Sequence, residues 1–261
     1  MRLTNPLGLL NNDPTQPVRV EEVANGLECN CYCAMCGGQF VAVQNANTPH
    51  FRHHNCDDCG GSFETAVHLM AKQVLVESKT LMLPYLKVRP EKRLWKVGSS
   101  VTQEILVVRR QRFQFDRVED ELWMDGRTPD IVMLKKDRKL LVEIVVTHAI
   151  SEDKLKWIRE NDYPTIRVDM SWANYDISRE MIRIAFYDGR MVNCTPRLNI
   201  MSWVHHPRRA KAQEEVNQRY LATLLPIGNR KTMACSLVGA PEPGAARAEL
   251  NSGCENRGDT S

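Results

Sequence analysis

The stretch Lys139-Leu140-Leu141-Val142-Glu143-Ile144-Val145-Val146-Thr147 decides the fold, because it is a nearly continuous apolar run. Side chains of a strand alternate between two faces, so a strand this apolar is usually covered on both faces, as in α/β proteins. One carboxylate, Glu143, interrupts the run. A buried carboxylate is costly unless it is paired or binds a metal, so Glu143 indicates a functional site as well as a strand.

The flanking sequence completes an α/β unit. Residues 128–134 predict a strand that forms a hairpin with the strand at 139–147 through a turn at 135–138. Beyond the hairpin, a serine N-cap opens a helix over 151–160, and a further strand follows at 164–170. A strand, a helix and a strand in this order predict a right-handed crossover with parallel pairing.

A helix over residues 62–78 precedes this unit, with Ser62 as its expected N-cap. Glu64, His68 and Lys72 recur every four residues and therefore lie along one face of the helix. Asp130 and Glu143 lie on the two strands of the expected hairpin, where they can converge on one hard cation such as Mg2+ or Mn2+. Glu64 then offers a third carboxylate.

A cluster of cysteine and histidine residues lies before this helix. Six of the nine cysteines fall between residues 29 and 59, in a chain without the features of a secretory signal peptide. Two Cys-x-x-Cys motifs in this window have the spacing of a small structural zinc site, and a His-x-x-His segment offers alternative ligands. The spacing predicts that zinc is bound by four of six residues, which are Cys33, Cys36, His50, His53, Cys56 and Cys59.

The rest of the chain carries weaker signals. We expect a lead-in over 1–27 with a short strand at 18–23, a small zinc-ribbon-like module over 28–61, a main domain over 62–190, a helical extension over 191–229 and a disordered tail over 230–261. Within these parts we expect a hairpin arm at 101–118, a helix at 177–187 and a long amphipathic helix at 203–225.

Charge and hydropathy limit the classes of function. The formal net charge of +3 is too small to indicate nucleic-acid binding by itself, but residues 87–117 hold nine basic and three acidic side chains. Arg109, Arg110 and Arg112 in this region are candidate phosphate contacts. The apolar runs are far shorter than the roughly 20 residues that a membrane helix needs, so we expect a cytoplasmic protein with no membrane association.

These motifs, in this order, carry a resemblance. A Cys-x-x-Cys motif, His50-Phe51-Arg52-His53, Glu64-x3-His68-x3-Lys72, Asp130 and Glu143 together resemble the competence protein CoiA-like nuclease family over about residues 28–170. The resemblance implies a zinc-binding region followed by a restriction-endonuclease-like mixed sheet flanked by helices, of the PD-(D/E)xK type that acts on DNA. It also implies that Asp130 and Glu143 bind Mg2+, with Glu64 as the carboxylate of the helix.

The chain departs from the family pattern at one position. The family usually has Lys or Gln two residues after the glutamate, whereas this chain has Val145. Lys72, His68 or Lys154 would have to supply the missing polar group from another element. The expected function is a metal-dependent deoxyribonuclease with a displaced basic residue, and the alternative is a catalytically inactive, zinc-stabilised nucleic-acid-binding adaptor. The sequence leaves the strandedness of the nucleic acid and the oligomeric state open.

Overall fold

A computed structural model of the chain describes residues 5–55, 57, 59–94, 103–191 and 199–224. The chain divides into two compact units, residues 1–217 and residues 218–261. The sheets and sites described below lie in the first unit. The tail expected over 230–261 lies outside the described residues, as does the start of the arm expected at 101–118.

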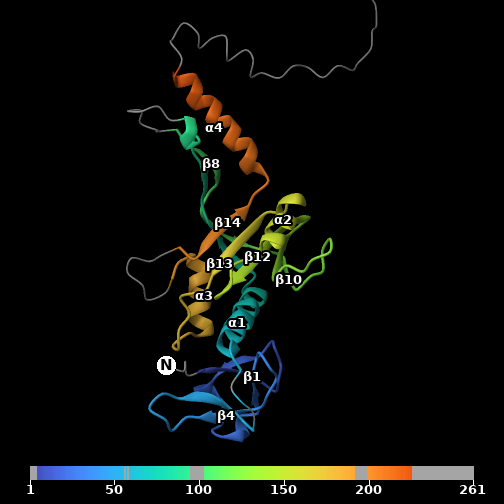
Figure 1. Cartoon of the computed structure of the whole chain (residues 1–261), viewed down its shortest axis with the longest axis vertical. Coiled ribbons are helices and arrows are strands. Elements are labelled where there is room, and N and C mark those ends of the chain that lie inside the picture. Colours follow the sequence, from blue (N-terminus) through green and yellow to red (C-terminus); the bar gives the residue numbers. More distant parts are fainter. Residues whose placement is uncertain (1–4, 56, 58, 95–102, 192–198, 225–261) are drawn as a thin grey trace, which may run out of the picture. The chain divides into compact units, whose positions relative to one another are not determined.

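A five-stranded mixed sheet forms the centre of the first unit (Figure 1). Its strand order is β10-β11-β12-β13-β14. The strands are β10 (Arg117–Asp120), β11 (Ile131–Lys135), β12 (Arg138–Val145), β13 (Thr165–Asp169) and β14 (Met201–His205). Strands β11 and β12 form the expected antiparallel hairpin, and β12 pairs in parallel with β13 after the helix α2 (Glu152–Glu160). The predicted hairpin and the predicted parallel pairing across the helix are confirmed.

Helices cover both faces of this sheet. Side chains of α1 (Ser62–Ser78) and α3 (Arg179–Asp188) share one apolar core with Val142 and Ile144 of β12. Leu141, the residue before Val142, packs in a second core with Trp157 and Ile158 of α2. Alternate residues of β12 therefore enter different layers, which is why the sequence of this strand is apolar throughout. The α/β class is confirmed.

A small N-terminal module precedes α1. Its first sheet has the order β2-β1-β3 and contains β1 (Leu7–Leu10), β2 (Pro17–Arg19) and β3 (Cys31–Tyr32). A separate hairpin pairs β4 (Phe40–Val43) with β5 (His50–His53). The rings of Phe40 and Phe51 stack with centroids 5.3 Å apart, in a core that also buries Cys29 and Cys31.

The strand expected at 18–23 is shorter than predicted. Strand β2 ends at Arg19, and a 3-10 helix, η1, covers Val20–Glu22. The carboxylate of Glu22 accepts a hydrogen bond from the Arg19 backbone N–H at 2.8 Å. This local bond satisfies a backbone donor within the turn and favours it over an extended conformation. A second 3-10 helix, η2, spans Leu27–Cys29.

The arm expected at 101–118 is built differently from the prediction. Strands β8 (Ile105–Val108) and β9 (Gln111–Gln114) do not pair with each other. Instead, β9 pairs with β6 (Thr80–Leu83) and β8 pairs with β7 (Leu86–Val88), with η3 at Lys92–Leu94. Pro84 separates β6 from β7, because proline lacks the N–H that a continuous ladder needs. The two-stranded arm therefore joins segments that the sequence patterns did not relate.

The helix expected at 203–225 starts later than predicted. Residues Met201–His205 form β14, and the helix α4 spans Arg208–Leu224. Trp203 is opposite Ile166 in the ladder with β13, and Pro207 disfavours helical conformation in the residue before it. Sheet pairing thus overrides the apparent helical periodicity of the first residues. In the part of the chain that the structure describes, every helix is too short or too polar to cross a membrane.

Candidate metal centre and active site

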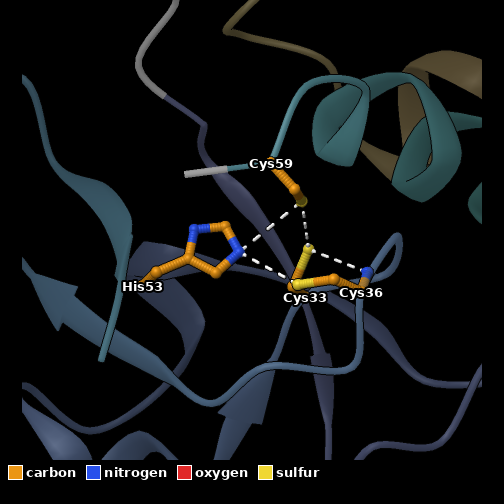
Figure 2. Close-up of side chains that lie close together, drawn as sticks. All are labelled: Cys33, Cys36, His53 and Cys59. Atoms are coloured by element: carbon orange, nitrogen blue, oxygen red, sulfur yellow. Dashed lines mark hydrogen bonds between the residues drawn. The ribbon is translucent and has the colours of Figure 1, made fainter. Parts of the chain in front are cut away.

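Four side chains of the N-terminal module converge on one point (Figure 2). The ligand atoms of Cys33, Cys36, His53 and Cys59 all lie within 4.8 Å of one another. The sulfur atoms of Cys33 and Cys59 are 3.3 Å apart, and His53 Nε2 lies 3.3 Å from the sulfur of Cys36. Three thiols and one imidazole match the Cys3His set of closed, structural zinc sites, so this cluster can hold a zinc ion.

The structure also separates the two histidines that the sequence left as alternatives. His53 lies opposite Phe40 in the β4–β5 hairpin, whereas His50 lies opposite Val43, three residues further along the strand. That separation amounts to about 10 Å at the rise of a β-strand. His50 directs Nδ1 to the carbonyl oxygen of Thr48, at 3.0 Å. His50 is therefore outside the cluster, and Cys56, the sixth candidate, lies outside the described residues.

The electrostatics of the cluster favour a bound cation. Burial, followed by the hydrogen bonds and charges of Cys33 and Cys36, raises the pKa of Cys59 to about 12. Burial opposes ionisation of Cys33, but hydrogen bonds from Ser62 and from the backbone N–H groups of Cys36 and Met35 outweigh it and lower the pKa of Cys33 to about 6. Without a metal, Cys59 therefore keeps its proton beside the Cys33 thiolate. A divalent metal stabilises neighbouring thiolates together, and its binding releases the proton of Cys59.

We expect the purified wild-type protein to hold stoichiometric zinc and His53→Ala to lose it, because the substitution removes one of four ligands. His50→Ala, on the same strand, should retain it. Metal content by inductively coupled plasma mass spectrometry and the thermal unfolding midpoint check both variants. Equal zinc content in the two variants would show that the ligand set is wrong.

The second site lies at the hairpin of the central sheet. Ile131 pairs with Val142, so Asp130, just before Ile131, lies beside Glu143, just after Val142. The backbone N–H of Ile144 donates a hydrogen bond to Asp130 Oδ2 at 2.8 Å. The predicted convergence of the two carboxylates is thus produced by the register of one antiparallel pair.

Two helices from opposite faces of the sheet reach this carboxylate pair. His68 of α1 lies with Nε2 3.2 Å from Asp130 Oδ2. Lys154 of α2 lies with Nζ 2.5 Å from Glu143 Oε2 and 3.7 Å from Asp130 Oδ1. Asp130 therefore connects the α1 layer to the α2 layer just before the start of β11, and the lysine ammonium is shared by the two acids.

The two carboxylates differ in their electrostatics. Glu143 is 3% exposed, and burial together with the charge of Asp130 raises its pKa to about 7, against the opposing effect of Lys154. Burial also opposes ionisation of Asp130, but His68, Lys154 and the Ile144 N–H outweigh it and lower the pKa of Asp130. Oε1 of Glu143 is buried and accepts no hydrogen bond within the described part of the chain. A buried, unpaired carboxylate oxygen is the kind of acceptor that a hard cation satisfies.

Lys72, the third residue proposed for the α1 face, is engaged away from the carboxylate pair. Lys72 is 2% exposed, and its Nζ lies 2.7 Å from Asp120 Oδ1 and 2.6 Å from Glu121 Oε1. Its ammonium therefore fixes the end of β10. Glu64 and His68 line a cavity of about 490 Å³. Ile144 of β12 and Val146, Thr147 and His148 after it also line this cavity.

The three arginines proposed as phosphate contacts are in different situations. Arg112 lies 3.2 Å from the ring centroid of Tyr187, and Arg110 is paired with Asp188 at 3.6 Å. Both are thus engaged with the end of α3, while Arg109 is exposed on the turn between β8 and β9. Among these three residues, Arg109 is the one whose described surroundings leave it open to a phosphate.

Sequence reasoning missed the groups that hold the site together. The N–H of Ile144 is a backbone donor that no side-chain motif could reveal. The carboxylates that bind Lys72 had a visible signal, the acidic run Glu119-Asp120-Glu121 that ends β10. A buried lysine needs such partners, so pairing this run with Lys72 was a possible inference.

Comparisons with models of protein families, with curated proteins and with solved structures find no match to this chain.

The raised pKa of Glu143 gives a stability test in zinc-loaded protein to which no Mg2+ or Mn2+ is added. Between about pH 4.5 and pH 7 the unfolded chain releases a proton that folded Glu143 still holds, so the free energy of unfolding falls as pH rises through this window. The side chain in Glu143→Gln does not titrate. The difference in free energy of unfolding, variant minus wild type, should therefore rise from pH 4.5 to pH 7. Chemical denaturation at several pH values measures the difference, and a difference that does not change with pH would contradict the environment described for Glu143.

Proposed function

We propose that the chain is a Mg2+- or Mn2+-dependent nuclease that cleaves DNA phosphodiester bonds in DNA processing, and that its zinc site is structural. The observation that carries the proposal is the buried acidic pair Asp130 and Glu143 with the ammonium of Lys154 beside both. This grouping supplies two hard oxygen ligands and one cation within one small region, which is what phosphodiester hydrolysis requires.

The position of Lys154 explains how the chain can function with Val145. By the alternation of β12, Val145 shares the face of Glu143 and Leu141, which is the face that α2 covers. Lys154 extends from α2 on that face to Glu143. A lysine from the neighbouring helix thus reaches the region that a lysine at residue 145 would serve. Under this proposal, Lys154 is the displaced basic residue among the three candidates Lys72, His68 and Lys154.

The order of elements also supports the proposal. Helix α1, strands β10, β11 and β12, helix α2 and strand β13 follow one another in the chain, with helices on both faces of the sheet. An α-β-β-β-α-β core of this kind is consistent with the restriction-endonuclease-like fold that the resemblance to CoiA-like nucleases implies. The carboxylates lie on the central hairpin, where that resemblance would put them.

Each residue has a chemical role under this proposal. Asp130 and Glu143 would hold the cation, and the unpaired Oε1 of Glu143 supports that fit. Bound Mg2+ supplies an activated water and neutralises charge on the phosphate. His68 orients Asp130 through its 3.2 Å contact. Lys154 orients the attacking water or stabilises charge on the scissile phosphate.

Contact with DNA would rest mainly on the phosphate backbone. The basic stretch over 87–117 includes Arg109, which is exposed. Contacts of this kind depend on charge and are independent of base sequence, so they weaken as the salt concentration rises. Single-stranded and duplex DNA are both compatible with this part of the proposal.

Cleavage by variants of the carboxylate site tests the proposed activity. We expect Asp130→Asn, Glu143→Gln and Lys154→Met each to lower the cleavage rate of labelled DNA with Mg2+ or Mn2+ by about a hundredfold or more, a typical cost of losing one transition-state contact. Lys156→Met is the matched control, because Lys156 lies on the same helix with its side chain 73% exposed. It should cleave like wild type.

The same assay can contradict the proposed nuclease activity. A folded, zinc-loaded wild-type protein that shifts DNA in a gel but cleaves it with neither metal would contradict the nuclease. The chain would then be the zinc-stabilised nucleic-acid-binding adaptor, with Lys154 and Glu143 as a structural ion pair. Cleavage that persists in Asp130→Asn and Glu143→Gln would place the activity elsewhere.

A further inference from the structure

A cavity of about 490 Å³ lies between the metal centre and the carboxylate site. One wall comes from the zinc-binding module, through Met35. The opposite wall comes from β12 and the residues after it, through Ile144 and Val146. Glu64 and His68 of α1 line it between these walls, and His68 contacts Asp130. The cavity therefore adjoins the proposed catalytic carboxylates while part of it belongs to the metal module.

Met35 lines this cavity and lies next to the first turns of α1. It lies between two residues of the metal cluster, Cys33 and Cys36, and its side chain is 58% exposed. The hydroxyl of Thr65 in α1 donates its one proton to the carbonyl oxygen of Gly61 at 2.9 Å, and its oxygen lies 3.6 Å from the Met35 sulfur. The sulfur of Cys33 lies 3.2 Å from Ser62 Oγ, in the first turn of the same helix. The metal-binding loop is thus attached to α1, and it presents a large apolar side chain that the described residues leave uncovered.

The chemistry of the walls fits a nucleobase better than a phosphate. Met35 and Val146 are apolar, so they can contact the face of a base without burying a polar group of their own. Glu64, in contrast, would repel an anion. Thr147 and His148 add hydrogen-bonding groups at the rim, and they contact each other at 2.9 Å. The volume is within the range of about 300 to 1,000 Å³ that small-molecule sites show, so it accommodates one nucleotide unit. A base in a duplex would have to leave its stack to enter.

We propose that this cavity is the subsite for an unpaired nucleobase next to the scissile phosphate, and that the substrate is single-stranded DNA or a single-stranded end. This inference rests on the proposed function and deepens it. The zinc-binding module then takes part in substrate binding directly, because its loop forms one wall of the subsite. Zinc organises that wall without touching the substrate.

Equilibrium binding tests the subsite without requiring cleavage. The zinc-loaded full-length chain, with no Mg2+ added, is titrated against a fluorescent single-stranded oligonucleotide and against the same sequence as a blunt duplex. We expect tighter binding of the single strand. Met35→Ala should weaken single-strand binding by about fivefold or more, because it removes most of an apolar side chain that a bound base would bury, and should change duplex binding little. Met35→Leu should retain most of the affinity.

Two controls make the result decisive. Leu27→Ala removes an exposed apolar side chain of the same module that does not line the cavity, and it should bind like wild type. Val146→Ala truncates the opposite wall away from the metal centre, and it decides the question if Met35→Ala fails to retain zinc. The proposal is overturned if both truncations leave single-strand binding unchanged, or if they weaken single-strand and duplex binding equally.

The outcomes also separate this inference from the proposed function. Loss of cleavage in Asp130→Asn together with unchanged binding in Met35→Ala and Val146→Ala would keep the nuclease and reject the subsite. Strand-selective binding that depends on Met35, in a protein that never cleaves, would keep the subsite and reject the nuclease.

Discussion

The cost of burying Glu143 inside an apolar strand is the constraint on which the rest of the site depends. A carboxylate that is 3% exposed must be neutral, paired or bound to a cation, and the fold offers the last two options at once. Lys154 supplies the pair, and Asp130 places a second carboxylate beside it. The same burial raises the pKa of Glu143 while His68 and Lys154 lower that of Asp130, so the two acids are chemically distinct.

This constraint links the two helix layers. The α1 layer contributes His68 and the α2 layer contributes Lys154, and both meet at Asp130 at the end of a sheet strand. Relative movement of either helix would leave a buried charge without its partner, which is destabilising. The packing of Trp157 and Ile158 against Leu141 holds α2 in place. The apolar core and the polar site therefore stabilise the same arrangement.

In the N-terminal module, too, a polar cluster and an apolar core stabilise the same arrangement. A module whose strands have two to four residues has little apolar surface to bury. A metal held by the Cys3His cluster would compensate by cross-linking the loop after β3, strand β5 and the segment before α1. Cys33 and Met35 both contact the first turns of α1. A shift of the module would therefore also move the helix that carries Glu64 and His68. A structural metal can influence a distant site by this route without any chemical role of its own.

Sequence alone determined the features that depend on local pattern. The apolar run of β12, the helical spacing on α1 and the paired Cys-x-x-Cys motifs predicted the α/β class, the hairpin with its crossover and a metal site, because each reflects a short-range rule of backbone geometry or ligand spacing. The tertiary structure decided what depends on contacts between distant residues. It selected His53 over His50 through the β4–β5 register, and it brought Lys154 to Glu143 while Lys72 went to Asp120 and Glu121. Helix periodicity places both lysines on plausible faces, but only the packing of each helix on the sheet determines which carboxylate its ammonium reaches.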